Sequence, residues 1–304
     1  MNKSVLIAGG SGSVGRHLAT FLEEKGFFVK SLSRNRKRCD GSDHYVYWDS
    51  DRDIFELGNF IPHHVVNLSG AGIADQKWSE KRKKIIIESR TKCTNFLINS
   101  LKNRDIHTES FISASAVGYY GHTGDQIAKE TDNPHTNEFL SQVCEVWEKA
   151  ASAAHEITNQ LTIVRISTVL MKDAGALEKM DKTIPFGMAN YLGNGKQYLP
   201  WIHIADLCGF IHHSLMLSGN SSEIYNIASP DEVTNYQFTE ILRDVINPKS
   251  LLLPAPKLSL KLLLGEMSRV VLNSTRVTTD KIKSIGYDLR FPKLKKALED
   301  IYQD

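Results

Sequence analysis

Residues 4–15, with the sequence SVLIAGGSGSVG, place a cluster of glycines directly after a short apolar run. The run has the length and β-branched content of a buried strand, and the apolar residues that follow, up to Leu22, recur at helical spacing. Glycines allow a sharp turn from strand to helix and a close approach of backbone N–H groups to a ligand. The G-x-x-G-x-x-G spacing of Gly9, Gly12 and Gly15 therefore predicts a phosphate-binding turn; a tight turn without a ligand is the simpler alternative.

The start of the expected helix should supply the donors for that phosphate. The first N–H groups of a helix have no partner within it, and the helix dipole adds positive potential at the same end. We therefore expect the pyrophosphate of a dinucleotide to be held by Gly9, Gly12, Ser13, Val14 and Gly15.

The end of the second expected strand carries a basic cluster, in the stretch SLSRNRKR. It contains Ser33 and Arg34, followed by three more basic residues, and it has no Asp or Glu. An acidic residue at this place usually binds the free 2′-hydroxyl of NAD, whereas arginine accommodates a 2′-phosphate. The cluster favours NADP(H), with Arg34 as the main contact, over a solvated basic loop.

Strands and helices alternate along the first part of the chain. Beyond the first strand we expect strands near 27–34, 45–48, 64–70, 110–116 and 161–168, and helices near 79–103 and 138–155. This alternation predicts an α/β fold, with a parallel sheet covered by helices on both faces. The nearly continuous apolar strands agree, because parallel strands are buried on both sides.

The rhythm changes after about residue 170, where prolines and glycines become frequent. We expect helices at 203–216, from Thr234 or Asn235 onward, over 257–272 and at 294–302, with a strand at 223–229. The segment 257–272 has an amphipathic pattern, and its leucines are too apolar to remain in water. The tail is therefore expected to be part of the fold.

Composition limits the partners of this 304-residue chain. Lys and Arg number 37 against 35 Asp and Glu, a net charge of only +2, so a nucleic-acid partner is not expected. The four cysteines form no Cys-x-x-Cys pair and the histidine pairs lack metal-ligand geometry, so we expect no metal. No segment has the roughly 18 unbroken apolar residues of a membrane span, and no signal region opens the chain. We expect a cytoplasmic protein that does not bind membranes.

Several segments together resemble a known superfamily. They are AGGSGSVGRHL, VVNLSGAGIADQKWSEKRKKIIIESR, FISASAVGYYG, VCEVWEKAA, GKQYLPWIHIADL and the tail that begins LPAPKLSLKLLLGEM. In this order they resemble extended short-chain dehydrogenases/reductases, and most closely the "epimerase family" group, whose members are also labelled nucleoside-diphosphate-sugar epimerase or cell-division inhibitor. The resemblance implies a doubly wound Rossmann-like domain over 1–170, to which 203–228 returns, and a smaller C-terminal substrate lobe within 171–304, with a family-type tail at about 253–302.

The resemblance also implies a place for catalysis. In this superfamily a serine works with a Tyr-x-x-x-Lys pair on the next helix, where the lysine lowers the tyrosine pKa. Ser115 matches the serine, but the chain has no Tyr-x-x-x-Lys, and the expected positions fall near Cys144 and Glu148. Either Tyr119 or Tyr120 replaces the missing acid, or both pack as loop aromatics. Glu148 is expected at the nicotinamide ribose.

Other residues should line the same crevice. The cofactor is expected to pass Asn67, Ser69, Gly70 and Ser113, which follow or end two strands. Arg90 meets either an anion or a structural carboxylate. The resemblance places Lys196, Gln197, Trp201 and His203 at the substrate, although His203 with Asp206 could simply start a helix.

Two functions remain open on these grounds. The first is an NADP-dependent oxidoreductase or epimerase that acts on a small polar, nucleotide-linked substrate. The second is a catalytically silent protein that binds NADPH as a sensor, which the missing Tyr-Lys pair favours. The sequence allows a homodimer without requiring one.

Overall fold

A large sheet organises the molecule, as the computed structural model shows for residues 3–172, 174–217, 219 and 221–303. Its strand order is β12-β8-β6-β5-β1-β2-β3-β4, and every pairing is parallel except that of β3 with β4. The strands are β1 (Ser4–Ala8), β2 (Phe28–Ser33), β3 (Tyr45–Asp49), β4 (Ile54–Phe55), β5 (His64–Asn67), β6 (Ser110–Ala116), β8 (Leu161–Ile166) and β12 (Ser222–Ile227). The predicted α/β fold is confirmed.

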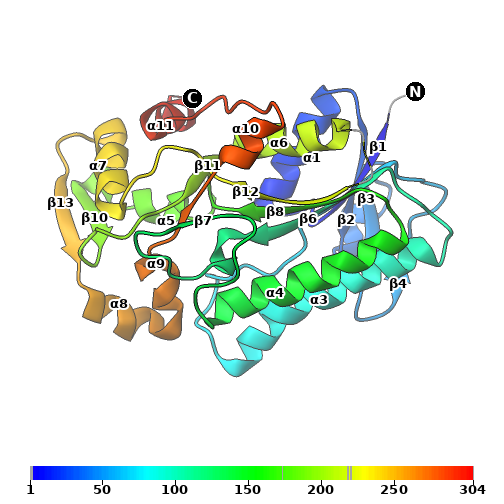
Figure 1. The fold of residues 1–304 in the computed structure, drawn as a ribbon, viewed down its shortest axis with the longest axis horizontal. Helices are drawn as coiled ribbons and strands as arrows, with labels where there is room; N and C mark the ends of the chain where they lie inside the picture. Colours follow the sequence, from blue (N-terminus) through cyan, green and yellow to red (C-terminus); the bar gives the residue numbers. More distant parts are fainter. Residues whose placement is uncertain (1–2, 173, 218, 220, 304) are drawn as a thin grey trace.

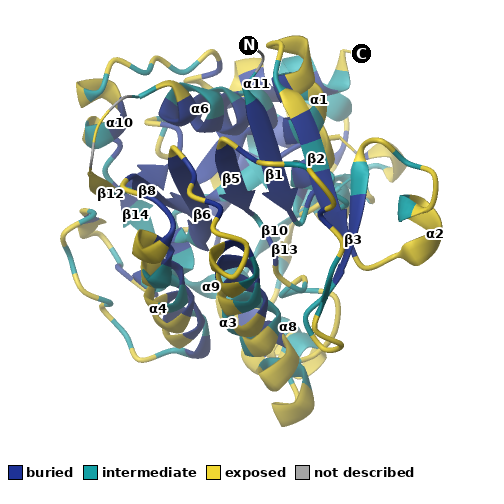
Figure 2. Cartoon of the chain, turned by 90° about the vertical axis from the view of Figure 1, so that its right-hand side faces the viewer, coloured by how far each residue is buried: buried dark blue, intermediate teal, exposed yellow. Residues whose placement is uncertain are grey.

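Helices cover both faces of this sheet, and Figure 1 shows them in two layers. One layer contains α1 (Ser13–Glu24) and α6 (Ile204–Met216), and the other contains α3 (Glu80–Lys102) and α4 (Phe139–Ala151). The strands between the layers are dark blue in Figure 2, because nearly all of their residues are buried. Two apolar clusters, centred on Ile7 and on Leu6, fill the space on the two faces of β1.

Local signals explain where several helices begin. Ser79 accepts a hydrogen bond from the backbone N–H of Arg82 and caps α3, which starts one residue later, as expected. Thr234 caps α7 (Asn235–Ile246) through a complete capping box with Gln237. Both helices were anticipated close to these positions.

The strand order fixes where a ligand can lie. From β1 the chain proceeds through β2 and β3 to one side, and then returns to place β5, β6, β8 and β12 on the other side. The order therefore reverses between β1 and β5. In open parallel sheets, ligands bind in the crevice beyond the carboxyl ends of the strands at such a reversal.

The C-terminal part builds a third apolar cluster away from the sheet. Its buried members include Trp201, Phe238, Leu294 and Leu298. The remaining elements are α2 (Arg36–Cys39), β7 (Ile127–Ala128), β9 (Thr168–Leu170), α5 (Leu177–Asp181), β10 (Met188–Leu192), β11 (Trp201–His203), β13 (Leu251–Ala255), α8 (Lys257–Leu264), α9 (Arg269–Leu272), β14 (Arg276–Val277), α10 (Asp280–Ser284) and α11 (Leu294–Tyr302). The parallel pair of β10 with β13 was not anticipated.

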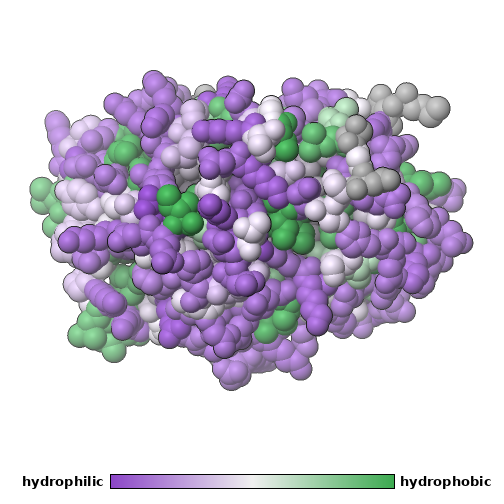
Figure 3. All heavy atoms as spheres, in the orientation of Figure 1, coloured by the Kyte–Doolittle hydropathy of each residue, from purple (hydrophilic) through white to green (hydrophobic). Residues whose placement is uncertain are grey.

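The leucine-rich segment of the tail corrects one expectation. The single helix expected over 257–272 is divided into α8, a short 3-10 helix and α9, and Gly265 at the division has a φ of 60°. Leu258 and Leu262 of α8 are 71% and 77% exposed, so this helix is not buried as its composition suggested. Figure 3 shows the hydrophobic residues at this corner, at the lower left. The tail is anchored instead by α11, whose Leu298 is fully buried.

No helix in the described part of the chain is both long and apolar enough to cross a membrane.

Candidate functional site

The glycine loop joins β1 to α1 at the reversal of the sheet. Gly9 has a φ of +80°, and the backbone N–H of Gly12 donates to its carbonyl oxygen over 3.0 Å. A Cβ at Gly15 would lie 2.3 Å from the Gly9 carbonyl oxygen and 2.6 Å from the Gly10 Cα, so only glycine lets the helix pack so closely on the loop. A Cβ at Gly12 would meet nothing nearer than 3.3 Å. Packing within the protein therefore does not explain the glycine at position 12. Gly12 is exposed at the tip of the loop, where a side chain would lie in the space expected for a ligand.

The N-terminus of α1 is open to an anion. Its N-cap is Gly12, which has no side chain to accept a hydrogen bond, and the first turn holds no acidic residue. The N–H groups of Ser13 and Val14 thus have no partner within the helix. An exposed glycine followed by bare N–H groups fits the pyrophosphate of a dinucleotide.

The arginines at the end of β2 differ in their contacts. Arg36 is paired with Glu56 and stacks on the ring of Tyr47, with its guanidinium carbon 4.1 Å from the ring centroid. Arg34 is exposed and has no ion pair within the described ranges. Ser33 is buried, and its hydroxyl accepts from the backbone N–H of Asn35. Arg34 is therefore the group that can meet a phosphate, while Ser33 shapes the turn.

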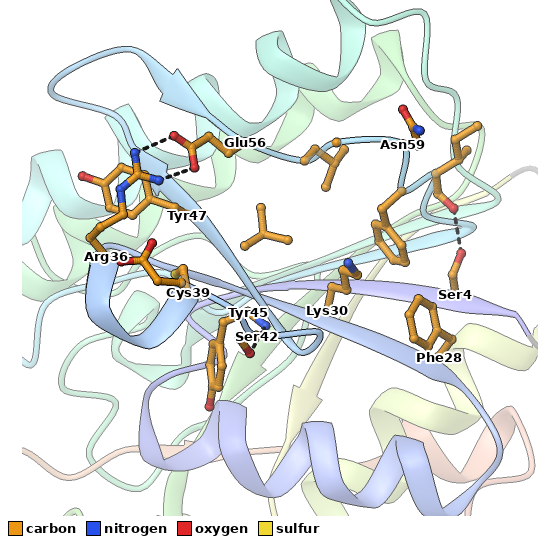
Figure 4. A pocket seen from close by; sticks show the side chains of 16 residues that line it. Ser4, Phe28, Lys30, Arg36, Cys39, Ser42, Tyr45, Tyr47, Glu56 and Asn59 are labelled. Carbon is orange, nitrogen blue, oxygen red and sulfur yellow. Dashed lines mark hydrogen bonds and ion pairs between the residues drawn. The ribbon is translucent and has the colours of Figure 1, made fainter.

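A hollow of roughly 650 Å³ lies beside the ion pair of Arg36 and Glu56, and Figure 4 shows its lining. Its residues include Ser4 and Phe28, which begin β1 and β2. The hollow therefore reaches the amino ends of the strands, whereas ligands of parallel sheets bind at the carboxyl ends. It is not the cofactor crevice.

At the end of β5, polar side chains form hydrogen bonds with one another. Asn67 donates to Thr94 Oγ1 over 2.7 Å, and its Oδ1 accepts from the Ser69 hydroxyl over 2.5 Å. Ser113, opposite Asn67 on β6, is fully buried. The side chains of Asn67, Ser69 and Ser113 are buried, the neighbouring Gly70 is exposed, and contact of these residues with a cofactor stays a prediction.

Ser115 belongs to a buried hydrogen-bonded cluster that joins three elements. Its hydroxyl on β6 donates to Glu148 Oε1 of α4 over 2.6 Å. Arg165 of β8 donates to the same carboxylate through Nε to Oε1 and through Nη2 to Oε2, both over 2.9 Å. Burial alone would lower the pKa of Arg165, but its bonds to Glu148 raise that pKa above its ordinary value. Glu148 thus binds Ser115 and Arg165, and its contact with the nicotinamide ribose stays a prediction.

The two adjacent tyrosines play different roles. Tyr120 is 0% exposed; its hydroxyl donates to Asn226 Oδ1 over 2.7 Å and accepts from Arg165 Nη1 over 2.8 Å. Burial raises its pKa to about 12. The Tyr120 side chain is enclosed, and its action on a substrate stays a prediction. Tyr119 is partly exposed and stacks with its centroid 3.5 Å from the Arg165 guanidinium carbon, and it remains the candidate phenol.

Arg90 is a largely buried cation without an acidic partner. It donates to the carbonyl oxygens of Ala71 and Ile86, and its guanidinium lies 4.9 Å from the centroid of the Trp147 ring. Burial lowers its pKa. Within the described residues it has no ion pair, so the expected alternative of a structural carboxylate was wrong. Because its guanidinium carbon lies 3.0 Å from where a Gly70 Cβ would stand, Arg90 faces the end of β5.

The comparisons with known proteins agree with this geometry. Residues 5–228 match the NAD dependent epimerase/dehydratase family, and residues 255–301 match a domain of unknown function, DUF1731. The chain belongs to the NAD-dependent epimerase/dehydratase family.

Individual relatives span the whole chain. The epimerase family protein SH2119 of Staphylococcus haemolyticus is 31% identical over 301 residues, which are 98% of this chain and 99% of that protein. The human epimerase family protein SDR39U1, solved with NADPH, is 26% identical, with a TM-score of 0.89 and coverage of 99% of both chains. A nucleoside-diphosphate sugar epimerase from Corynebacterium glutamicum is 25% identical, with a TM-score of 0.75, covering 99% of this chain and 58% of that one.

Membership in this family makes the departures at the catalytic helix more informative. Cys144 stands near the position expected for the tyrosine, and it is buried, with a pKa raised to about 11 by burial. It is therefore a poor acid and a poor nucleophile near neutral pH. Glu148, four residues later, holds Arg165 where a lysine was expected.

Two of the residues expected at the substrate are structural in this family member. Trp201 is fully buried, and its Nε1 donates to the carbonyl oxygen of Asp231. His203 caps α6, because its Nδ1 accepts from the backbone N–H of Ala205 over 3.2 Å. Burial lowers the pKa of His203 to about 4. The alternative role of His203 at the helix start is confirmed, and the substrate contacts of Trp201 and His203, both buried here, stay predictions.

The neighbouring loop retains one candidate. Gln197 is buried, and its Nε2 donates to the carbonyl oxygens of Leu192 and Val271, so it ties the lobe together. Lys196 is exposed beside it and stays available to a ligand.

Sequence reasoning missed two polar residues of β8 and the turn that follows it. Arg165 sits inside the apolar run LTIVRIST, and a charge in a buried strand requires a partner, which was a usable signal. The Ser167 hydroxyl is buried without a hydrogen-bond partner at the carboxyl end of the sheet. An orphaned donor at that end is free to meet a bound ligand.

Among the described residues, no group of three or more His, Cys, Asp or Glu side chains could hold a metal ion.

Proposed function

We propose that this protein is an NADP(H)-dependent oxidoreductase or epimerase that acts on a small polar substrate. One observation carries the proposal: the chain has both an α1 N-terminus without a side-chain cap or acidic residue and an exposed arginine, Arg34, at the end of β2. The first group suits a pyrophosphate and the second a 2′-phosphate. A human relative of 26% identity was solved with NADPH, which supports the same preference.

The cofactor, when bound, would supply hydride transfer at the crevice, and the chain's residues would orient it. Gly9, Gly12, Ser13, Val14 and Gly15 would hold the pyrophosphate, and the exposed edge of Gly70 would run beside it. Ser167 would offer its free hydroxyl at the same edge of the sheet.

The substrate is proposed to carry an anionic group. Arg90 is a partly buried cation with no carboxylate partner among the described residues, and Lys196 is exposed. Buried cations need a compensating anion, and arginine suits phosphate and carboxylate. Nucleotide-linked compounds are the first class to test, since one relative is a nucleoside-diphosphate sugar epimerase.

Two measurements test the proposal. Isothermal titration should give NADPH a dissociation constant at least about tenfold below that of NADH, or about 1.4 kcal/mol. Absorbance of bound NADPH should then fall when a sugar-nucleotide, quinone or aldehyde panel is added. Equal affinities for the two cofactors would remove the NADP assignment.

A second function has its own supporting observation. Cys144 and the paired Glu148 leave the two positions of α4 expected for the catalytic tyrosine and lysine without a group that exchanges a proton near neutral pH, as in a protein that binds NADPH without turnover. Such a sensor would bind NADPH tightly and consume none of it across the whole panel. That result would favour the sensor over the enzyme.

A further inference from the structure

Large apolar side chains gather at one end of the C-terminal lobe, and no other part of the described chain covers them. They lie on β10 and β13, on the short 3-10 helix just before β10, and on α8, which follows β13. Their exposed fractions run from 37% to 82%. We call this surface the leucine corner, and its members are Phe186, Met188, Leu251, Leu253, Leu258, Leu262 and Leu263.

The pairing of β10 with β13 forms one half of the leucine corner. Met188 lies opposite Leu251, so both side chains are on the same face of the two-stranded sheet, and Leu253 follows on that face. The other face carries Ala189, which is 0% exposed and belongs to the apolar cluster of the lobe. One face of this sheet is therefore buried, and the other is apolar and open.

Helix α8 forms the other half. Leu260 and Leu264, one turn apart, are partly buried, whereas Leu258 and Leu262 lie on another side of the helix and are 71% and 77% exposed. Every residue of α8 is at least partly exposed. The helix thus rests on the protein along a narrow stripe and presents its other leucines to solvent. Contiguous exposed apolar surface of this kind marks a site of protein or membrane contact.

The charge of the leucine corner selects the partner. Residues 245–265 contain three lysines and no aspartate or glutamate. Lys249, Lys257 and Lys261 are exposed, and none of them forms an ion pair with a described residue. A second copy of this chain would bring the same lysines together across a symmetric interface, and their repulsion opposes self-association. The surface therefore favours an anionic partner.

The shape of the leucine corner favours a lipid surface over an acidic protein. Figure 1 places β13 and α8 at one extremity of the molecule, and Figure 3 shows hydrophobic residues protruding there. A protein partner would need a pocket for each protruding leucine, whereas fluid lipid closes around them. A helix of lysines and leucines can lie in the plane of the lipid surface, with leucines among the acyl chains and ammonium groups at the headgroups.

We infer that the leucine corner attaches this protein to anionic lipid surfaces, with α8 lying in the plane of the interface. The inference goes beyond the proposed function and is independent of it, because the corner uses none of the residues assigned to the cofactor or the substrate. It replaces the sequence prediction that the protein does not bind membranes. That prediction relied on the lack of a spanning segment, and a helix that lies on a lipid surface needs none.

Co-sedimentation of the full chain with vesicles tests the inference. One set of vesicles is phosphatidylcholine alone, and the other is an equal mixture of phosphatidylcholine and phosphatidylglycerol. At low salt the partition coefficient should be at least about tenfold higher on the anionic vesicles, because each lysine at such a surface adds about fivefold. About 0.5 M salt should remove most of this difference. Equal binding to both sets, or no binding to the anionic set, would overturn the inference.

A pair of substitutions tests the leucines without changing any charge. In the double variant Leu258→Gln, Leu262→Gln the partition coefficient on anionic vesicles should fall at least about tenfold, because two apolar side chains no longer enter the lipid. The matched control is Ile61→Gln, Met216→Gln, at two exposed apolar residues outside the corner. An unchanged melting temperature shows that each variant is folded. Equal losses in the two double variants would mean general adsorption and would contradict the inference.

A second pair tests the lysines and keeps the inference falsifiable even where the leucine variant is unstable. Lys257→Gln, Lys261→Gln should lower binding to anionic vesicles about twentyfold. Lys295→Gln, Lys296→Gln makes the same change in net charge at exposed positions of α11 and should have little effect. Size-exclusion chromatography covers the rival partner. A dimer that Leu258→Gln, Leu262→Gln dissociates, in a protein that ignores anionic vesicles, would assign the corner to a second copy and overturn the lipid inference.

Discussion

The two ends of the crevice recognise their ligands by different means. At the glycine loop the chain offers backbone N–H groups, and the loop packs closely on Ser31 of β2 and on Leu68 after β5. At Ser115 it offers one side chain whose behaviour depends on Glu148 and Arg165, from two other elements. The first end therefore binds through the backbone, and side chains elsewhere act on it only by packing against the loop. The second end can be altered by a substitution on a strand that never touches the ligand.

The largest expected effect comes from Arg165→Met. Removing the guanidinium leaves Glu148 as an unpaired, mostly buried carboxylate, so the free energy of unfolding should fall by about 3–5 kcal/mol. Urea unfolding measures the loss, and Arg52→Met, at an exposed arginine, is the control.

The double variant Arg165→Met, Glu148→Met sharpens this prediction. Replacing both charges with apolar side chains of similar volume should restore most of the stability. If the double variant is as unstable as Arg165→Met alone, packing around Arg165 and not the ion pair is what the cluster contributes.

Gly12→Val tests the opposite end. Gly12 has a φ of −76°, and its nearest neighbour to a Cβ is 3.3 Å away, so the fold should accept a side chain. That side chain would occupy the place of the pyrophosphate, and NADPH affinity should fall by roughly a hundredfold, or about 2.7 kcal/mol.

Calorimetric titration measures the affinity, and Thr20→Val, an exposed position on α1, is the control. Gly15→Val should behave differently from Gly12→Val, because its Cβ would collide with the loop and lower the melting temperature as well. Undiminished NADPH affinity in Gly12→Val would mean that the loop is a turn and nothing more.

The protonation of His203 should make the free energy of unfolding depend on pH without changing the affinity for NADPH. Burial lowers its pKa to about 4 in the folded protein, below the value of about 6.5 expected in the unfolded chain. The unfolded state therefore binds more protons between these values. Stability is complete above pH 6.5 and is lost as the pH falls toward 4, by about 2 kcal/mol at pH 5.

His203→Asn should reduce this acid sensitivity, because asparagine can cap α6 without titrating. Urea unfolding at pH 5 and pH 8 measures the change. NADPH affinity should be the same in both proteins at either pH; a difference confined to the wild type would return His203 to the ligand site.

Arg34→Ala gives the smallest effect. The affinity for NADPH should fall about tenfold, or 1.4 kcal/mol, while that for NADH stays constant. Arg38→Ala, in the same basic stretch, is the control, since Arg38 lies over the Tyr45 ring. Equal losses for the two cofactors would show that Arg34 supplies general positive charge and does not read the 2′-phosphate.

The sequence predicted those parts of the molecule that depend on local geometry. The glycine spacing, the caps at Ser79 and Thr234 and the buried parallel strands each follow from neighbouring residues. The pairing of β10 with β13 could not be predicted in this way. Proline is rare in central strands and one face of β13 is exposed, so the segment around Pro254 lacks the pattern of a buried strand. Burial was also misjudged: α8 is apolar yet exposed.

In the candidate site, too, features set by neighbouring residues could be predicted, and features set by residues distant in sequence could not. Gly12 and Arg34 were identified because the turn and the strand end carry their own signals. The enclosure of Tyr120 and the bond between Glu148 and Arg165 depend on strand β8 lying beside β6, which no local pattern specifies. The burial of Trp201 and His203 was not predicted, because resemblance gives positions along the chain but not the direction of a side chain.

The cluster at Ser115 also has a consequence for the order in which the chain can fold. Its bonds join residues separated by 33 positions (Ser115 to Glu148), 45 (Tyr120 to Arg165) and 106 (Tyr120 to Asn226). Contacts so distant in sequence are costly in loop entropy and form slowly. The nascent chain can complete the glycine loop early, whereas the cluster must wait until β12 has been synthesised and has joined the edge of the sheet. A ribosome-bound intermediate would therefore hold the phosphate-binding turn well before Tyr120 acquires its hydrogen bond to Asn226.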